Sequence, residues 1–484
     1  MSALTEQPNK NYMQAFPYMR LIDDCVVGEP ALKYGQNQKH YLPSPCCPDE
    51  DPEVAERRYN RYLKSAEFDG VPSVTLEALL GALSHQPNNY DGIPESMDYI
   101  INDADGDGLS LDEHIKIAQA ELLKMRFCGL LAEYSDLAGM GIGDEQLTRA
   151  QVKQLGLRSS IKYYSRKSIL DWNFRRINGV KQLSYVLLSE NETRERDGDE
   201  GGLVLEDVKS YLILALDEEG NYYQKKRIET ETGWTERFYP ETPNGMFNFI
   251  PFEFAIQGSY PKGVLPDELG YLLPVCTKSI YRYNMYAAMK ESMHFTAAPI
   301  TWSAGWTEQG FKLFKDMNGG RDYLSVEAGS HWTLPEGATT GVIETSGDNS
   351  PYFTYLDRNA KEIKALGGAF DTDMQDSEQT ATATLVNAAE RLSVLSSLQS
   401  GLEWSYARVI GYCAMFKGID QDIELKLNRE FTSVKLSPQE RQQITNEYMQ
   451  GVISHDEALR QLEKGGVLTV EAEQLLQEIE LSGQ

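Results

Sequence analysis

The residues of this chain whose types and spacing best suit ligand chemistry are three aspartates at alternate positions: Asp103, Asp105 and Asp107. Alternate aspartates in a glycine-containing loop can direct their oxygens at one Ca²⁺ ion, as in an EF-hand. In that loop, the twelfth residue is a glutamate that binds the ion with both oxygens. Counted from Asp103, the twelfth residue is His114, and Glu113 comes one position early. We therefore expect a tight polar turn over Asp103–Gly108, before a helix that starts near Ser110.

Patterns typical of catalysis are missing from the rest of the sequence. The glycine-rich string Gly139–Gly143 has neither the spacing of a dinucleotide-binding loop nor the lysine of a phosphate-binding loop. The six histidines are isolated from one another, so none has a second histidine ligand at helical spacing. No serine lies in the Gly-x-Ser-x-Gly pattern of a nucleophile. We expect no enzyme activity and no cofactor.

Negative charge dominates the composition. The 484 residues include 73 Asp and Glu against 46 Lys and Arg, a formal net charge of −27. A protein that grips nucleic acid needs a cationic surface to displace the counterions of the phosphates. A role with DNA would therefore be one of passage rather than of tight binding. One acidic run, 371–378, contains four acids and no basic residue, which by itself indicates a solvated loop.

The periodicity of apolar residues predicts an α+β chain that is mainly helical. Residues 1–55 show no clear period and are expected to be irregular. Helices are predicted over 51–68 and 73–83, after Pro94, and over 110–131. Alternating β-branched and aromatic residues then predict a β-rich part over 162–256, with strands at 183–188 and 211–216 and a hairpin partner at 222–229. The polar stretch 190–202 is expected to be an exposed loop.

The second half of the chain alternates long helices with shorter elements. The sequence predicts a helix over 274–295, an α/β insert over 296–350 and a second helix over 352–370. Apolar residues from Leu385 to Phe416 then recur every three or four positions, which predicts one amphipathic helix of roughly 35 residues, kinked at Gly401. A strand over 423–427, helices that begin near Ser437 and Ser454, and a last helix over 469–481 follow.

Six cysteines are scattered without the spacing of metal ligands, which indicates free thiols in a reducing compartment. No apolar run is long enough to cross a bilayer. The first residues show no basic segment followed by an apolar one. We therefore expect neither membrane association nor a secretory signal.

Seven short strings, taken in their order along the chain, carry a likeness to a known family. They are 62–68 (YLKSAEF), 75–81 (TLEALLG), 101–111, 169–172 (ILDW), 250–251 (IP), 378–383 (EQTATA) and 451–454 (GVIS). In this order they resemble the portal proteins of tailed bacteriophages, and most of all a portal family first catalogued as phage proteins of unknown function. The resemblance covers most of 55–470.

The resemblance implies the portal fold, in which a wing, a stem, a clip and a helical crown form a ring. It places a wing over 1–265, helical to about 160 and β-rich over 162–256, a descending stem helix over 266–296 and a clip over 297–350. It then places an ascending stem helix over 351–370, a tunnel loop over 371–380, a long wing helix and strand over 378–434, and a crown over 435–484.

The same resemblance implies a ring of twelve copies at one capsid vertex, which conducts double-stranded DNA during packaging and ejection. The implied partners are the terminase large subunit, head-tail adaptor or tail proteins, and the major capsid or scaffolding protein. The implied locations are the virion and, during assembly, the host cytoplasm.

Two sets of residues could face the DNA in such a ring. The acids of the tunnel loop would line the channel: Asp371, Asp373, Asp376 and Glu378. Cations of the descending stem helix are the alternative set: Lys278, Arg282 and Lys290. The competing hypothesis for the whole chain is a calcium-binding structural protein that uses Asp103–Gly108.

Overall fold

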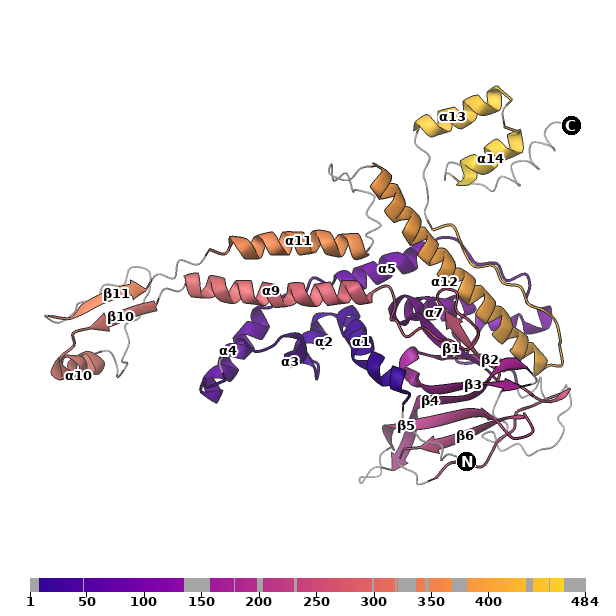
Figure 1. Cartoon of the computed structure of the whole chain (residues 1–484), viewed down its shortest axis with the longest axis horizontal. Helices are drawn as coiled ribbons and strands as arrows, with labels where there is room; N and C mark the ends of the chain where they lie inside the picture. Colours follow the sequence, from indigo (N-terminus) through magenta and orange to yellow (C-terminus); the bar gives the residue numbers. More distant parts are fainter. Residues whose placement is uncertain are drawn as a thin grey trace. The chain divides into compact units, whose positions relative to one another are not determined.

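The computed structural model describes residues 8–46, 48–134, 157–177, 179–197, 203–229, 233–297, 300–317, 320, 337–343, 348–367, 381–431, 438–451 and 453–464. The structure is 48% helix and 20% strand, in agreement with the predicted α+β class. The chain divides into two compact units, whose residues can be found in Figure 1 by the colour bar. Unit 1 comprises residues 1–26, 72–274 and 367–484, and unit 2 comprises residues 27–71 and 275–366.

Two antiparallel sheets make up most of the β structure of unit 1. The first has the order β2–β1–β9 and contains β1 (Phe127–Tyr134), β2 (Ser159–Tyr164) and β9 (Phe252–Ile256). The second contains, in order, β3 (Ile169–Ile177), β4 (Val180–Asp197), β5 (Leu203–Leu216) and β6 (Tyr222–Ile228). The predicted strands and the hairpin partner are confirmed. A small hairpin joins β7 (Glu241–Thr242) to β8 (Gly245–Met246).

The predicted amphipathic helix is α12 (Ala381–Met415), 35 residues long, which packs on β1, β2, β9 and α7 (Leu111–Met125). Its periodic apolar residues are buried from Leu395 onward, including Leu402 and Tyr406. At Gly401, predicted to mark a kink, the backbone of α12 closely approaches the backbone of β9. A Cβ at this position would lie 2.3 Å from the carbonyl oxygen of Ile256. The missing side chain therefore lets the helix backbone sit directly on the end of β9.

Three of the predicted N-terminal helices correspond to α4 (Pro52–Ser65), α5 (Val71–Leu83) and a short α6 (Tyr99–Asn102). The fourth, predicted over 110–131, is too long. It is α7, which ends where Arg126 takes a left-handed backbone conformation with φ of 69°. The apolar residues beyond it form β1, which is buried on both faces. A strand buried on both faces has no alternation, so its pattern cannot be separated from that of a helix.

The prediction that residues 1–55 are irregular is wrong. They form α1 (Lys10–Val27), α2 (Glu29–Tyr34) and α3 (Gln38–Tyr41). In α1 the buried residues recur at helical spacing, from Tyr12 to Met19 and Cys25. Pro17 inside the helix and the polar residues between the buried ones obscured this period in the sequence.

A buried guanidinium holds the last residues of unit 1 before the following helix. Arg166 donates hydrogen bonds to the carbonyl oxygens of Met125, Pro266, Asp267 and Glu268, at 2.7 to 3.3 Å. Its guanidinium carbon also lies 4.6 Å from the ring centre of Phe127. Burial lowers the pKa of Arg166 to about 10, so the group stays charged at neutral pH. Main-chain oxygens therefore accept the hydrogen bonds of this cation, while the charges of Asp267 and Glu121 also favour its protonated form.

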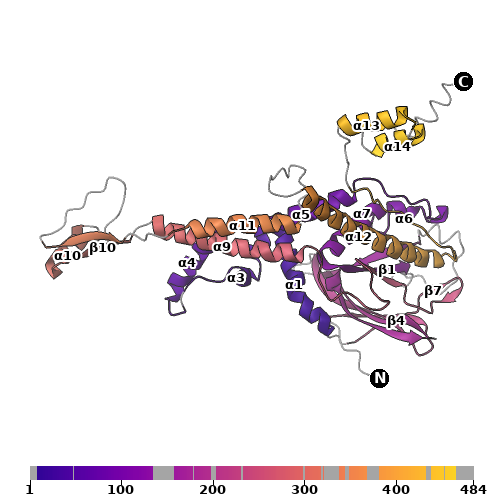
Figure 2. The ribbon, with the colours of Figure 1, turned by 45° about the horizontal axis from the view of Figure 1, so that its top comes forward.

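Unit 2 is built around α9 (Leu273–Ala297), the helix predicted over 274–295. Figures 1 and 2 both show α11 (Ser350–Gly367), predicted over 352–370, lying alongside α9. On α9, Tyr283 and Ala287 form one buried cluster with Tyr59, Tyr62 and Leu63 of α4. The helix α9 is therefore contacted by α4 as well as by α11.

The predicted α/β insert between these two helices is confirmed in type. It contains β10 (Ile300–Ala304), α10 (Glu308–Met317) and β11 (Thr339–Ile343), and the two strands pair antiparallel. We call this part the tip. The indole of Trp302 covers Gly341 on the partner strand, where a Cβ would lie 2.7 Å from the ring.

Two further predictions need correction. The expected loop 190–202 is largely strand, since β4 runs to Asp197 and β5 begins at Leu203. In this strand Glu190 is paired, because it accepts a hydrogen bond from the hydroxyl of Tyr164 at 2.6 Å and lies 2.8 Å from Lys162. The expected strand 423–427 is reduced to an isolated bridge between Lys426 and Asn89, although its alternating apolar residues are buried as predicted.

The predicted helices near the C-terminus are α13 (Pro438–Met449) and α14 (His455–Lys464), which contact each other. The helix predicted over 469–481 lies outside the described residues.

Candidate functional site

The two helices predicted to form a stem lie side by side and antiparallel. Near the start of α9, the Nζ of Lys278 donates to Glu362 near the end of α11, at 2.6 Å. Near the end of α9, Ser292 donates to the side chain of Asn349, just before α11, at 2.9 Å. A polar contact therefore links the two helices near each end of the pair. The tip lies between them in the sequence.

Each of the three cations predicted on the first stem helix has an acidic partner within unit 2. Lys278 pairs with Glu362, Arg282 with Asp69 and Lys290 with Glu67. The side chains of the three cations are between 21% and 38% exposed. Hydrogen bonding to Glu362 raises the pKa of Lys278. That these cations face DNA stays a prediction, but their charge is balanced inside the subunit.

A second ion cluster fixes α4 against α9. Glu291 on α9 accepts a hydrogen bond from Arg58 at 3.1 Å and lies 3.6 Å from Arg61. The bond to Glu291 raises the pKa of Arg58. Because Glu291 is nearly buried and both arginines belong to α4, this cluster sets the position of α4 along α9.

The acids predicted to line a channel fall outside the described residues: Asp371, Asp373, Asp376 and Glu378. In the sequence, these acids lie between α11, which ends at Gly367, and α12, which begins at Ala381. Their role stays a prediction.

The aspartate loop is closed by its own hydrogen bonds. One oxygen of Asp103 accepts from the backbone of Gly106 and Gly108, and one oxygen of Asp105 accepts from Asp107 and Leu109. The other oxygen of Asp103 is paired with Arg158. The backbone and the arginine lower the pKa of Asp103 against the opposing effect of burial. These contacts are those of a polar turn, as predicted.

The residues where an EF-hand would complete its ligands serve other contacts. Glu113 forms a capping box with Ser110, accepting from its backbone and its hydroxyl. His114 is buried, with Nδ1 2.7 Å from the hydroxyl of Tyr406 and Nε2 3.0 Å from the carbonyl oxygen of Ile161. In the part of the chain that the structure describes, no three His, Cys, Asp or Glu side chains form a group that could hold a metal. The calcium hypothesis therefore gains no support.

Sequence reasoning missed a polar cluster on α12. Arg408 lies over the ring of Trp404 at 4.5 Å, donates to the hydroxyl of Tyr412 at 2.6 Å and pairs with Glu253 of β9 at 3.5 Å. Burial raises the pKa of Glu253 to about 7, although Arg408 and Tyr412 oppose the shift. The four-residue spacing of Trp404, Arg408 and Tyr412 was visible in the sequence, but their partner on β9 was not.

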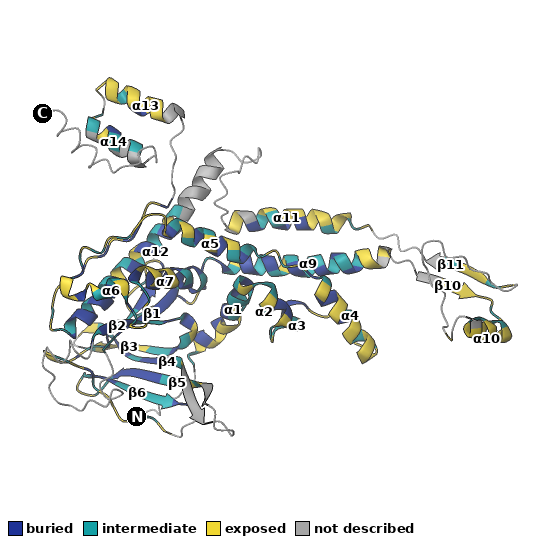
Figure 3. Ribbon diagram, turned by 180° about the vertical axis from the view of Figure 1, so that it is seen from behind, coloured by how far each residue is buried: buried dark blue, intermediate teal, exposed yellow. Residues whose placement is uncertain are grey.

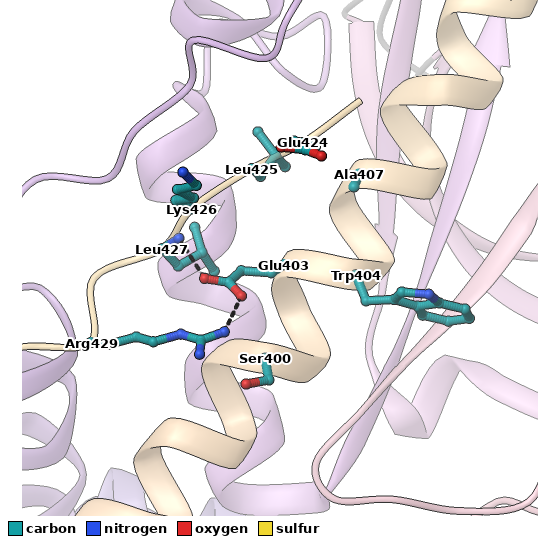
Figure 4. Close-up of a pocket in the computed structure, with 9 residues that line it drawn as sticks. All are labelled: Ser400, Glu403, Trp404, Ala407, Glu424, Leu425, Lys426, Leu427 and Arg429. Atoms are coloured by element: carbon teal, nitrogen blue, oxygen red, sulfur yellow. Dashed lines mark hydrogen bonds and ion pairs between the residues drawn. The ribbon is translucent and has the colours of Figure 1, made fainter. Parts of the chain in front are cut away.

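A groove of about 710 Å³ lies between α12 and the extended segment 424–429 (Figure 4). Glu403 accepts from the backbone of Leu427 at 2.8 Å and pairs with Arg429, as the dashed lines show. Trp404, 54% exposed, lines the same groove. Glu403 is therefore engaged by these two contacts, and Ser400, Glu424 and Lys426 also line the groove.

Two further properties concern the described residues alone. No helix among them combines the length and the apolar character that crossing a membrane requires. The cysteines at 25, 46, 128, 276 and 413 are free thiols.

A family model described as "Domain of unknown function (DUF4055)" matches residues 272–417, from just before α9 to just after α12. No curated protein matches the chain.

Solved structures of gene transfer agent (GTA) particles resemble the chain. "Virion of native gene transfer agent (GTA) particle" has a TM-score of 0.39 and 13% identity, covering 81% of this chain and 89% of that one. "Neck of empty GTA particle computed with C6 symmetry" has a TM-score of 0.41 and 12% identity, covering 85% of this chain and 93% of that one. "Neck of native GTA particle computed with C12 symmetry" has a TM-score of 0.40 and 13% identity, covering 83% of this chain and 92% of that one. TM-scores of this size describe a partial likeness of the backbone, which carries no functional conclusion.

Proposed function

We propose that the chain is the portal subunit of a tailed-phage-like particle, which forms a ring of twelve copies at one capsid vertex and conducts DNA without catalysis of its own. The observation that carries the proposal is the antiparallel pair of α9 and α11, joined through the tip. An acidic connection and the 35-residue α12 follow in the order that the sequence resemblance implies.

The lengths of the helices suit a ring subunit. At 1.5 Å per residue, α12 spans roughly 50 Å and the 25 residues of α9 roughly 38 Å. Helices of this length are unusual in small domains. Side by side in a closed ring, such helices form a wall that is long enough to enclose a segment of duplex.

The distribution of charge also supports a conduit. Unit 2 contains 15 Lys and Arg against 18 Asp and Glu, a net charge of −3. The rest of the chain contains 31 Lys and Arg against 55 Asp and Glu, a net charge of −24. Twelve copies would carry about −324 formal charges, which solution salt screens beyond roughly 8 Å. An acidic wall opposes adhesion of phosphates, so DNA slides past without capture.

The proposed partners follow from the same assignment. The tip, in the place of a clip, would bind the terminase large subunit during packaging and a head-tail adaptor or tail protein afterwards. The wing would meet the major capsid or scaffolding protein. ATP hydrolysis would belong to the packaging motor. The protein would reside in the virion, after assembly in the host cytoplasm.

Electron microscopy of the purified protein, together with its native mass, tests the assembly. We expect rings of about a dozen subunits with a central hole. If neither the purified protein nor the vertex of assembled particles shows a ring of this chain, the proposed function is wrong.

The channel role has its own test. A variant with D371N, D373N, D376N and E378Q should form rings of normal mass but alter DNA packaging or retention, because neutral side chains oppose phosphate adhesion less. The matched control is E218Q with E219Q in the exposed turn between β5 and β6. Normal packaging by the four-acid variant would remove the tunnel-loop assignment while the ring remained.

A further inference from the structure

The helix α11 presents three kinds of surface around its axis. Leu356, Asn359 and Ile363 are buried, and they recur at the three- and four-residue spacing of a single face. Because α11 contacts α9 at both of its ends, this buried face is the one that meets α9. Large apolar side chains lie exposed on its two flanks: Phe353 on one and Tyr355 and Leu366 on the other.

The face of α11 opposite α9 is a narrow cationic strip. Its members recur at steps of four, three and four residues and are all exposed: Thr354, Arg358, Lys361 and Ala365. The strip contains two cations, two small side chains and no large apolar residue. Figure 3 shows how much of α11 is exposed compared with α9.

The cations of the strip differ from those of α9 in their exposure and pairing. The side chain of Arg358 is 80% exposed, and its partner Glu362 lies on the same helix, 3.0 Å away. Lys361 forms no ion pair with any residue that the structure describes. Lys278, Arg282 and Lys290 on α9 are each balanced by an acid. Among the described side chains of this pair of helices, Lys361 is therefore the exposed cation with no acid at ion-pair distance; Asp357, one turn before it, is exposed as well.

The side chains around the strip identify the kind of partner. A protein partner would bind through large apolar anchors, typically aromatic ones. The apolar side chains of α11 lie on its flanks, where neighbouring copies in a ring would meet. Two exposed cations flanked by small side chains suit the phosphates of a nucleic acid backbone, which arginine and lysine contact without reading sequence.

We propose that Arg358 and Lys361 are the phosphate-contacting residues of the helical pair and touch double-stranded DNA as it passes. This inference rests on the proposed portal function and assigns its stem contact to α11 rather than to the cations of α9. Two cations per copy, one already shared with Glu362, give brief contacts that a moving duplex can break. The strip thus guides the duplex within a chain whose net charge repels it.

A charge reversal in assembled particles tests the strip. R358E with K361E should lower the ratio of DNA-filled to empty particles several-fold and leave the ring unchanged in electron micrographs. The matched control is R57E with K64E, which reverses two exposed cations of α4 on another part of unit 2. Equal packaging by both variants, or a defect in the α4 variant alone, overturns the assignment.

A photo-crosslinking amino acid at position 361, compared with one at position 64, decides the case even if the charge reversal prevents assembly. In DNA-filled particles we expect adducts with DNA at 361 and none at 64. Adducts of position 361 with protein only would show that the strip docks an acidic protein, and the proposal would be wrong. In that event rings would still form, whereas failure of the proposed function would leave no ring at all.

Discussion

The Nζ of Lys278 on α9 lies 2.6 Å from the Oε2 of Glu362 on α11, and this contact joins two helices across 84 residues of sequence. Both side chains are partly exposed, so their attraction is screened by salt and small. We expect Glu362→Lys to increase hydrogen exchange of α9 and α11 at low salt, because two cations would then face each other. The double variant with Lys278→Glu should restore protection. Unchanged exchange in the single variant would show that other contacts hold the pair.

Gly401 and Gly411 form a matched pair on one helix. A Cβ at Gly401 would lie 2.3 Å from the carbonyl oxygen of Ile256, whereas nothing lies within 4 Å of one at Gly411. Gly401→Ala should destabilise the protein by roughly 2–4 kcal/mol, because α12 must move off the sheet. Gly411→Ala should stabilise it by up to about 1 kcal/mol through helix propensity. Chemical denaturation measures both, and equal effects would contradict the close approach.

Glu253 should make stability fall with rising pH. Its pKa is raised from 4.5 to about 7 in the folded state, so the folded protein holds a proton that the unfolded chain has lost. This contribution is complete below pH 4.5 and is lost as pH rises through 7, amounting to on the order of 3 kcal/mol. The charged or titratable neighbours are Arg408, Tyr412 and Lys262.

Glu253→Gln tests this contribution, because it keeps the shape of a protonated carboxyl. The difference in unfolding free energy between variant and wild type should shift in favour of the variant from pH 5 to pH 8. Glu218→Gln in the exposed turn is the control. A difference that does not vary with pH would show that Glu253 is ionised throughout.

His114 should have the opposite dependence. Burial lowers its pKa below the ordinary 6.5, so its stabilising contribution is present above pH 6.5 and is lost as pH falls through the folded pKa. The carbonyl of Ile161 can only accept, so Nε2 carries the proton and Nδ1 accepts from Tyr406. His114→Gln should cost roughly 2–4 kcal/mol at pH 8 and less at pH 5. The exposed His85→Gln is the control, and a cost that grows toward pH 5 would contradict the assignment.

Calcium should not affect the protein. The oxygens of Asp103 and Asp105 already accept from their own loop, and Arg158 pairs with Asp103. We expect no saturable heat on titration with Ca²⁺ and no change of melting temperature with a chelator. A stabilisation that follows Ca²⁺ concentration and disappears in Asp103→Asn would restore the calcium hypothesis.

Elements with one buried face were predictable from the sequence. The leucines of α12 lie at helical spacing because a single face meets the sheet, so both its type and its length were found. The strands around 183–188 and 211–216 were found for a similar reason. Where burial is complete, as in β1, or where a proline interrupts the pattern, as at Pro17 in α1, the period disappears and the prediction failed.

Contacts between distant segments were not predictable. Nothing in the sequence joins Glu253 to Arg408, or Arg282 to Asp69, because such pairs are set by tertiary packing. The stretch from Glu190 was taken for a loop because of its charges, yet Lys162 pairs with its first carboxylate and Tyr164 donates a hydrogen bond to it inside a strand. The acids from Asp371 to Glu378 were found by composition alone, and their predicted role awaits the packaging experiment.

The way Arg166 binds has an evolutionary consequence. Its guanidinium donates to the carbonyl oxygens of residues 266–268, so these hydrogen bonds do not depend on the side chains there, although the charge of Asp267 also favours the protonated arginine. The hydrogen bonds would therefore survive a change of residue type at these three positions, whereas they require an arginine at position 166. Conservation of the arginine in related chains therefore does not require a conserved hydrogen-bonding residue opposite it, because the acceptor is a stretch of backbone.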